Sequence, residues 1–288
     1  MSERAKTAFI TGGASGIGRA LAERLLSKGW HVFIADLNHA AMQEMALQHN
    51  KPSNFVLHYV GTDVSSWGAQ VGVFKQALEV LGGRIDFVAA VAGIGEKKWI
   101  PFPEEVMRMG PGEFAKPDLS VLDVDLTGLL WTVALAVQQF RRQEPDAEGW
   151  RGKIGVTASV CGFYNVATLP VYTAAKHGVV GFTRSYGRLL PEEGISLNAV
   201  CPNIVRTSIS TSQFYDAVER EGLLVSMEGV IAAFEKCLEG AESGEVYECG
   251  PKGGFVPKQS AGYLDEESRR SMELLTKRAR PLHYVGEE

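Results

Sequence analysis

The stretch T-G-G-A-S-G-I-G at residues 11–18 decides how this chain of 288 residues folds. It directly follows an apolar run, Lys6–Ile10, that predicts a buried strand. It also opens the pattern Ile17–Lys28, whose apolar residues recur at helical spacing. Glycines elsewhere in a chain are ordinary turn residues, but these join a strand to a helix. The order of strand, glycine cluster and helix predicts a site that binds the phosphates of a dinucleotide.

Each glycine of the cluster has a distinct task in such a site. Gly12 allows a tight turn, Gly16 lets the backbone approach a pyrophosphate, and Gly18 lets the helix pack closely on the strand. The helix N-terminus offers free N–H groups and a partial positive charge to the phosphates. We therefore assign to the cofactor site Gly12, Ser15, Gly16, Ile17 and Gly18.

Apolar runs alternate with helical patterns along the rest of the chain. Strands are expected at Lys6–Ile10, His31–Ala35, Asn54–Val60, Phe87–Val91, Lys153–Ala158, Ser196–Val200 and Glu245–Glu248. Helices are expected at Ile17–Lys28, Asn38–His49, Ala69–Leu81, Leu119–Arg142, Val171–Leu190 and Met227–Leu238. This alternation implies βαβ units. The predicted fold is α/β, a single doubly wound (Rossmann) domain over residues 1–288 with a mostly parallel sheet and helices on both faces.

Three stretches interrupt this alternation. Gly95–Pro117 and Thr207–Ser226 are long loops, which in a compact domain are usually functional or disordered, and we expect both to border a substrate pocket. Residues 250–288 form a C-terminal tail with a helix expected at Asp265–Lys277. This tail either packs on a neighbouring subunit or is mobile.

Composition excludes several classes of protein. The chain has 29 Lys and Arg against 34 Asp and Glu, a net charge of −5, so a nucleic-acid partner, which usually meets a basic face, is not expected. No apolar run approaches the roughly 18 residues that span a bilayer, and no signal-peptide core precedes the first strand, so no membrane association is expected. The cysteines lack C-x-x-C spacing, which favours the cytoplasm and buried thiols, and we expect no metal site. They are Cys161, Cys201, Cys237 and Cys249.

Acidic residues at the ends of two strands indicate how the nucleoside would be held. Asp36 follows Gly18 by 18 residues, where a carboxylate accepts hydrogen bonds from both ribose hydroxyls and repels a 2′-phosphate. The expected cofactor is therefore NAD rather than NADP. Asp36 or Asn38 would alternatively cap the next helix. Asp63 and Val64 would contact the adenine, with a turn cap as the alternative for Asp63.

Tyr172 and Lys176 are four residues apart on one predicted helix, so their side chains emerge from the same face. An ammonium beside a phenol stabilises the phenolate and lowers the pKa of the tyrosine toward neutrality. Tyrosine then becomes a usable general acid or base. Ser159 ends the fifth strand, where its hydroxyl would hold a substrate oxygen. Taken singly, the three are a core aromatic, a solvated lysine and a turn serine, but their order along the chain is specific.

These residues resemble the short-chain dehydrogenase/reductase family over about residues 5–250. The resemblance rests on the glycine cluster, Ser159, Y-T-A-A-K at 172–176 and N-A-V-C-P-N-I-V-R-T at 198–207. The sequence P-V-Y-T-A-A-K-H-G-V-V-G-F-T-R-S at 170–185 is similar to the branch of NAD-dependent hydroxyprostaglandin dehydrogenases. The family implies a seven-stranded sheet and hydride transfer between nicotinamide and a carbonyl or secondary alcohol. It also implies a homodimer or homotetramer packed through the two longest predicted helices.

The resemblance assigns a role to each matching residue. Tyr172 exchanges the proton, Lys176 lowers its pKa and bonds the nicotinamide ribose, and Ser159 orients and polarises the substrate oxygen. Thr207 contacts the nicotinamide carboxamide. The further cofactor positions that the family implies here are Ala92, Gly93, Pro202 and Ile204.

Three positions depart from the family pattern. Residues 90–93 read A-V-A-G where the family has N-N-A-G, which puts the rigidity of the cofactor side in doubt. Asn203 replaces a glycine and can occupy the left-handed region. Asp125 replaces the fourth catalytic residue, an asparagine that helps to hold a water linked to Lys176. We hypothesise that an ionised Asp125 offsets the ammonium and raises the pKa of Tyr172. A protonated or water-bridged Asp125 would instead act as asparagine does.

The expected pocket linings are rich in large apolar side chains, although half of these would simply cover the core. They favour a bulky lipophilic secondary alcohol or ketone, such as a terpenoid, steroid or polyketide of secondary metabolism. Arg206 is the candidate for clamping a carboxylate, and NAD favours the oxidative direction. The alternatives are a non-redox isomerisation or cyclisation, and a catalytically idle NAD-binding protein. The lining residues are Trp99, Ile100, Phe102, Phe163, Tyr164, Phe214 and Tyr215.

Overall fold

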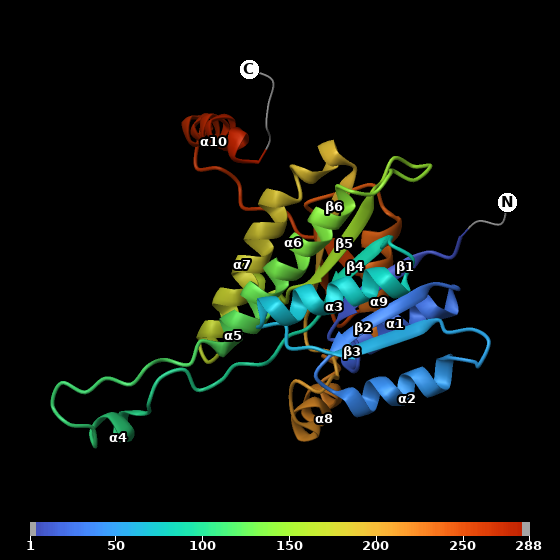
Figure 1. Ribbon diagram of the computed structural model, residues 1–288. Helices are drawn as coiled ribbons and strands as arrows, with labels where there is room; N and C mark the ends of the chain where they lie inside the picture. The colour runs from blue at the N-terminus through green and yellow to red at the C-terminus, as the bar shows by residue number, and fades with distance from the viewer. Residues whose placement is uncertain (1–3, 284–288) are drawn as a thin grey trace. The chain divides into compact units, whose positions relative to one another are not determined.

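In the computed structural model, which describes residues 4–283, the chain builds one eight-stranded sheet (Figure 1). The strand order is β3-β2-β1-β4-β5-β6-β7-β8, and only the β7–β8 pairing is antiparallel. The strands are β1 Thr7–Thr11, β2 His31–Asp36, β3 Leu57–Gly61, β4 Phe87–Ala90, β5 Gly152–Thr157, β6 Ile195–Pro202, β7 Val246–Cys249 and β8 Phe255–Pro257. The predicted doubly wound, mostly parallel fold is confirmed.

The sheet has one strand more than the expected seven. β8 folds back on β7 through a turn at Gly253 and Gly254, whose φ angles are +84° and +74°. This left-handed region is open to glycine at no steric cost. The sequence places both glycines in the expected C-terminal tail and does not predict the short strand after them.

Helices cover both faces of the sheet and enclose two separate cores. The helices α1 (Gly16–Ser27), α2 (His39–His49) and α9 (Met227–Glu239) pack on one face, and α3 (Trp67–Val80), α6 (Leu129–Phe140) and α7 (Pro170–Tyr186) on the other. Along β4, Phe87 and Ala89 enter the core covered by α1, α2 and α9, and Val88 and Ala90 enter the core covered by α3, α6 and α7. This is the pattern of a strand buried on both faces in a parallel sheet.

The long helix expected at Leu119–Arg142 is three segments, α5 (Ser120–Leu122), a π-helical turn η1 (Asp123–Gly128) and α6. Within residues 4–283, Ser120–Phe140 alone is long and apolar enough to cross a membrane, so the expectation that no such run exists was wrong. Buried α6 residues such as Val133, Ala136 and Phe140 account for this apolarity, because they form part of the core.

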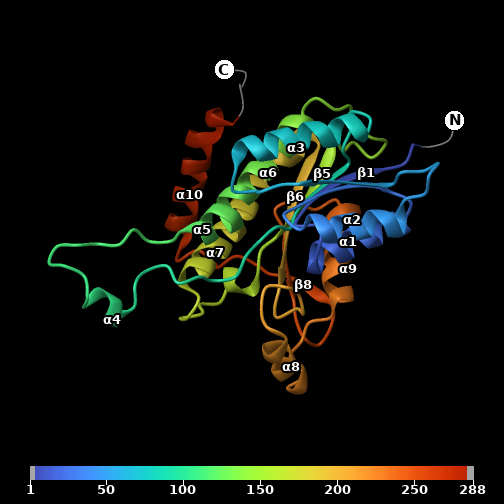
Figure 2. The same cartoon turned by 60° about the horizontal axis from the view of Figure 1, so that its bottom comes forward.

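Both long loops carry helices that the sequence did not predict, α4 (Pro103–Val106) and α8 (Ser212–Arg220). Residues 97–118, hereafter the arm, leave the carboxyl end of β4 and return to α5 (Figure 2). The chain divides into two compact units, the first ending at Pro257 and the second starting at Lys258. The second unit contains α10 (Glu266–Ala279), which Asp265 caps by accepting from the N–H of Ser268.

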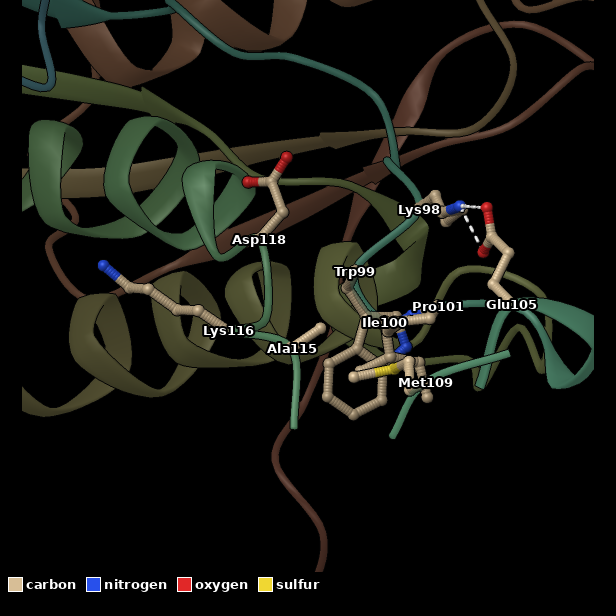
Figure 3. Close-up of a pocket in the computed structure, with 9 residues that line it drawn as sticks. All are labelled: Lys98, Trp99, Ile100, Pro101, Glu105, Met109, Ala115, Lys116 and Asp118. Atoms are coloured by element: carbon tan, nitrogen blue, oxygen red, sulfur yellow. Dashed lines mark hydrogen bonds and ion pairs between the residues drawn. The ribbon is translucent and has the colours of Figure 1, made fainter. Parts of the chain in front are cut away.

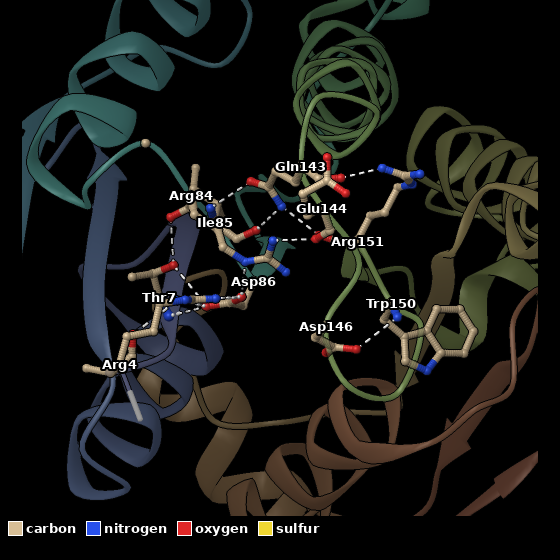
Figure 4. A network of polar contacts seen from close by, with 12 residues as sticks. Arg4, Thr7, Arg84, Ile85, Asp86, Gln143, Glu144, Asp146, Trp150 and Arg151 are labelled. Atoms are coloured by element: carbon tan, nitrogen blue, oxygen red, sulfur yellow. Dashed lines mark hydrogen bonds and ion pairs between the residues drawn. The ribbon is translucent and has the colours of Figure 1, made fainter. Parts of the chain in front are cut away.

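A polar network ties the strands together at their amino ends (Figure 4). The Asp86 carboxylate accepts from Arg4, Arg84 and the N–H of Thr7. Burial raises the pKa of Asp86, but these partners outweigh it and hold that pKa below its usual value. The Gln143 amide bonds both backbone groups of Ile85. This end of the sheet is thus fixed by its own side chains, whereas ligands of such folds bind at the carboxyl ends of the strands.

Candidate active site

Four of the predicted residues meet at the carboxyl ends of β4 and β5. Tyr172 and Lys176 share one face of α7, and the Lys176 Nζ lies 5.3 Å from the centroid of the Tyr172 ring. The Lys176 ammonium is buried and also donates to the Thr157 carbonyl at 3.3 Å. Ser159 directly follows β5, and Asp125 reaches the same place from η1. The spacing of four residues therefore places phenol and ammonium together as expected.

Ser159 has a structural role and a chemical one. Its Oγ accepts from the N–H of Cys161 at 3.2 Å and so caps the short 3-10 turn η2 (Val160–Gly162). A hydrogen bond between Ser159 and Tyr172 also acts to lower the pKa of the phenol. The turn-residue interpretation and the substrate-side interpretation of Ser159 are thus compatible.

Asp125 forms a direct ion pair with Lys176, with 3.0 Å between Oδ2 and Nζ, and neither side chain is more than 4% exposed. Its Oδ1 accepts from the N–H of Ile94 at 2.8 Å. A distance of 3.0 Å leaves no room for a water between the two groups, so the water-bridged alternative does not describe this arrangement. π-Helical turns are rare and concentrate at functional sites, and η1 presents this carboxylate to the lysine.

The ion pair between Asp125 and Lys176 affects the pKa values of both Lys176 and Tyr172. Burial lowers the pKa of Lys176, but Asp125 and Tyr172 act to raise it and the pKa is raised overall, so the lysine stays charged. Burial raises the pKa of Tyr172; Lys176 acts to lower it and Asp125 to raise it again, and the outcome is a raised pKa. The direction agrees with the hypothesis that Asp125 weakens the effect of the ammonium.

The glycine cluster forms a cradle that fits a dinucleotide phosphate. Gly12 has φ +68°, and a Cβ there would lie 2.6 Å from the Cα of Ala92, while a Cβ on Gly18 would lie 2.1 Å from the carbonyl oxygen of Gly12. Gly16 has φ +51°. Ser15 is the N-cap of α1 but its side chain makes no capping hydrogen bond, which leaves the N–H groups of this first turn to a ligand. Phosphate groups suit that combination of backbone donors and helix dipole.

Thr11 connects β1 to the A-V-A-G segment, which lacks the two asparagine side chains of the family pattern. Its Oγ1 accepts from the N–H groups of Val91 and Ala92 at 3.2 and 3.4 Å, which joins the end of β1 to the end of β4. Gly93 follows at once, and a Cβ there would lie 3.3 Å from the Asp125 carboxylate. The cofactor side is therefore tied by a hydroxyl within the glycine motif itself, a role that the sequence analysis overlooked.

Asp36 is not the cap of the next helix. Its Oδ2 accepts from the N–H of Ala14 at 3.0 Å and its Oδ1 from the N–H of Asn38 at 2.9 Å. Asn38 is the N-cap of α2 and accepts from the N–H of Ala41. The carboxylate of Asp36 thus borders the glycine cluster, where the ribose of a dinucleotide would lie.

Asp63 and Val64 are positioned by their neighbours. Asp63 Oδ1 accepts from both the N–H and the hydroxyl of Ser65, which is the turn cap named as its alternative role. The carbonyl of Val64 accepts from the buried amide of Gln70 at 2.7 Å, and that amide also bonds the Gly128 carbonyl at 2.8 Å. Gln70 therefore fixes Val64 against η1, and the contact of this segment with the adenine stays a prediction. Its position inside α3 gave no sequence signal for this task.

The segment after β6 lies against the glycine cluster. Pro202 ends β6, and Ile204 donates its N–H to the Asn203 side chain at 2.9 Å. Within residues 4–283 no residue other than glycine has a positive φ, so Asn203 does not take the left-handed conformation proposed for it. A Cβ on Gly16 would lie 3.0 Å from the Thr207 methyl group. Thr207 thus lies beside Gly16 of the glycine cluster, and its contact with the nicotinamide carboxamide stays a prediction.

The expected substrate residues separate into distinct groups. Trp99 and Ile100 line a pocket of about 350 Å³ that is built from arm residues alone and does not include Tyr172 (Figure 3). Tyr215 is buried and Phe163 packs against the core. Exposed side chains at the same loops are Phe102, Tyr164 and Phe214.

Arg206 does not act as a free clamp for a carboxylate. It pairs with Asp216 at 2.8 Å and with Glu219 at 2.9 Å. All four cysteines are free and buried. Burial raises the pKa of Cys249 to about 12, so this thiol stays protonated at neutral pH. Neither Arg206 nor Cys249 therefore adds a reactive group to the site.

Comparisons with known proteins agree with this geometry. Residues 6–217 match the family described as short chain dehydrogenase. The short-chain dehydrogenase/reductase prx7 of Penicillium rubens is 32% identical over 228 residues, which cover 78% of each protein. The 15-hydroxyprostaglandin dehydrogenase (NAD+) of Macaca fascicularis is 33% identical over 216 residues, 74% of this chain and 73% of that protein.

A solved structure extends the match to the whole fold. The crystal structure of 3-hydroxyacyl-CoA dehydrogenase type-2 from Mycobacterium avium has a TM-score of 0.72 and 26% identity, and the match covers 88% of this chain and 97% of that one. The chain therefore belongs to the short-chain dehydrogenase/reductase family, and it is an oxidoreductase that binds a nicotinamide dinucleotide.

Proposed function

We propose that the protein is an NAD-dependent oxidoreductase that interconverts a secondary alcohol and a ketone on a bulky lipophilic small molecule. The observation that carries this proposal is the grouping of Tyr172, Lys176 and Ser159 at the carboxyl end of β5. This group lies at the same edge of the sheet as the glycine cradle. A tyrosine becomes a usable general acid or base when a fixed cation lies beside its hydroxyl, and these residues provide both groups.

The residues of the chain divide the work. Tyr172 gives or takes the proton of the substrate oxygen, Ser159 orients that oxygen, and Lys176 supplies a positive charge that stabilises the phenolate. The bound nicotinamide supplies or accepts the hydride. The groups that would hold the cofactor are Gly12, Ser15, Gly16, Ile17, Gly18, Asp36, Asp63, Val64, Ala92, Gly93, Tyr172, Lys176, Pro202, Ile204 and Thr207.

Asp36 supports NAD as the cofactor rather than NADP. Its carboxylate is held beside the glycine cluster by the N–H groups of Ala14 and Asn38, so it is fixed in place before any ligand binds. A fixed carboxylate accepts from two ribose hydroxyls and repels a 2′-phosphate. The macaque relative is named as an NAD+ enzyme, which points the same way. With NAD, oxidation of the alcohol is the favoured direction.

The loops around the site support a lipophilic substrate. Phe102, Tyr164 and Phe214 are exposed on these loops, and Arg206 is already paired with two carboxylates. Large exposed apolar side chains on these loops suit a terpenoid, steroid or polyketide skeleton. Similar proteins include a fungal short-chain dehydrogenase/reductase and a 15-hydroxyprostaglandin dehydrogenase, which is consistent with such substrates.

We further propose a cytoplasmic homodimer or homotetramer that works on small molecules, without nucleic-acid or membrane partners. The apolar side chains of α6 and α7 that are only partly buried support the assembly. They include Leu130, Leu135, Phe182 and Tyr186. A second copy packed on these helices would cover them.

Turnover of a panel of bulky secondary alcohols with NAD, monitored by NADH absorbance, tests the function. The wild type should form NADH, and Tyr172→Phe should lose about 10²- to 10⁴-fold in kcat while still binding NAD. Conversion of a substrate without net NADH would instead support isomerisation or cyclisation. Binding of NAD without turnover across the panel would support an idle NAD-binding protein. Full activity of Tyr172→Phe would refute the proton-transfer role.

A further inference from the structure

The first turn of α7, which carries Tyr172, is held by a carboxylate from outside the helix. The helix begins at Pro170, which has no N–H, and the residue before it makes no side-chain capping hydrogen bond. The next two N–H groups donate to Glu96. Val171 donates to its Oε1 at 3.2 Å and Tyr172 to its Oε2 at 2.7 Å. One side chain thus satisfies two donors that the helix leaves without partners.

The short segment that carries Glu96 also holds the other side of the site. Two residues earlier, the N–H of Ile94 donates to Asp125 Oδ1 at 2.8 Å, and Asp125 in turn pairs with Lys176. Residues 94–96 therefore fasten η1 and α7 to each other. The arm continues directly from this segment, so the contact lies where the arm joins the catalytic groups.

The hydrogen bonds between Glu96 and the first turn of α7 are expected to be strong. Hydrogen bonds to an ionised carboxylate are shorter and about twice as strong as neutral ones, and the 2.7 Å distance to the Tyr172 N–H fits this class. A negative charge at a helix N-terminus also gains from the helix dipole. Both oxygens of Glu96 accept from backbone N–H groups of α7, so this side chain holds the start of the helix in place.

We propose that Glu96 is a positioning residue of the active site, which fixes the first turn of α7 and with it the phenol of Tyr172. The inference rests on the proposed oxidoreductase function, because a fixed phenol matters for a proton transfer at Tyr172. No motif in the sequence marks Glu96; its role follows from the two hydrogen bonds across 75 and 76 residues of chain.

Hydrogen exchange tests the contact without reference to activity. In Glu96→Ala the amides of Val171 and Tyr172 should exchange at least about tenfold faster, while the later turns of α7 keep their protection. The ring resonances of Tyr172, assigned by their loss in Tyr172→Phe, should move as well. Asp265→Ala is the matched control, since it removes a carboxylate cap from α10, and it should alter neither signal. Unchanged exchange and unchanged ring resonances in Glu96→Ala would overturn the proposal.

Kinetics test the consequence for catalysis. Glu96→Ala should lower kcat by about 10- to 100-fold, because a small misplacement of a reacting group has that effect, with the KM for NAD unchanged. Glu96→Gln should fall between wild type and Glu96→Ala, because its amide has one accepting oxygen. A purely structural role would lower Tm in all variants without changing kcat per folded site, and that result refutes positioning. If wild type itself turns over no substrate, the proposed function fails, and the exchange and resonance measurements still decide the Glu96 contact.

Discussion

Replacing Asp125 by asparagine should make the enzyme work at lower pH. The variant Asp125→Asn keeps the shape of the side chain but removes a negative charge 3.0 Å from the Lys176 Nζ. In the wild type that charge acts to raise the pKa of Tyr172, which burial raises as well. Without it, the ammonium acts on the phenol unopposed, so the pKa of Tyr172 should fall.

The structure sets the size of the effect. The Lys176 Nζ lies 5.3 Å from the Tyr172 ring centroid, so Asp125 Oδ2 is at most 8.3 Å (5.3 Å plus 3.0 Å) from that centroid. A unit charge at this distance is worth about 2 kcal/mol at an effective dielectric constant of about 20. That energy corresponds to a pKa change of about 1.5. With some screening by solvent, we expect a fall of about one pH unit.

The assay is the pH dependence of kcat/KM for alcohol oxidation. Oxidation needs the phenolate, so activity rises as the pH passes through the pKa of Tyr172, and this acid limb should move about one unit lower in Asp125→Asn. The basic limb should also move down, because Asp125 is the first among the groups that raise the pKa of buried Lys176. Asp123→Asn removes an exposed carboxylate from the same π-helical turn and serves as the control. A profile that coincides with wild type, or an acid limb at higher pH, would refute the reasoning.

Two further substitutions test the cofactor cradle. Asp36→Ala should reduce the preference for NAD over NADP by about 10- to 100-fold in kcat/KM, since it removes a charged acceptor, whereas Asn38→Ala removes only the cap of α2 and should leave the preference as it is. An unchanged preference in Asp36→Ala would exclude the ribose role. Gly18→Ala places a Cβ 2.1 Å from the Gly12 carbonyl oxygen, so NAD binding measured by calorimetry should be abolished. Gly72→Ala is the control, because the space around Gly72 is open. This variant should raise the free energy of unfolding, measured by urea titration, by up to about 1 kcal/mol. Wild-type NAD affinity in Gly18→Ala would contradict the close packing.

Much of the fold follows from patterns that local physical chemistry enforces. The strand β4 is buried on both faces and is uniformly apolar, so periodicity alone places it. Its neighbour β3 begins at Leu57 rather than at the expected Asn54, because the Asn50 side chain accepts from the N–H groups of Val56 and Leu57 and holds this entry as a turn. Such contacts between a side chain and a distant backbone leave no trace in apolar spacing.

Local spacing also predicts part of the catalytic group. Tyr172 and Lys176 are neighbours on one helix, so their spacing decides their proximity. The direct pairing of Asp125 with Lys176 depends on a π-helical turn. Apolar residues at α-helical spacing predict a regular helix and do not predict this turn. The contribution of Glu96 depends on where a long loop starts after β4, which is set by tertiary packing alone.

The short strand β8 has a consequence for how the protein resists aggregation at this edge of the sheet. An open row of backbone donors and acceptors at a sheet border invites strands from other chains, which is a route to fibrils. β8 has three residues, and its last, Pro257, stands opposite Tyr247 and has no N–H to offer. A border this brief, ending in an imino acid, gives an incoming peptide little template for growth.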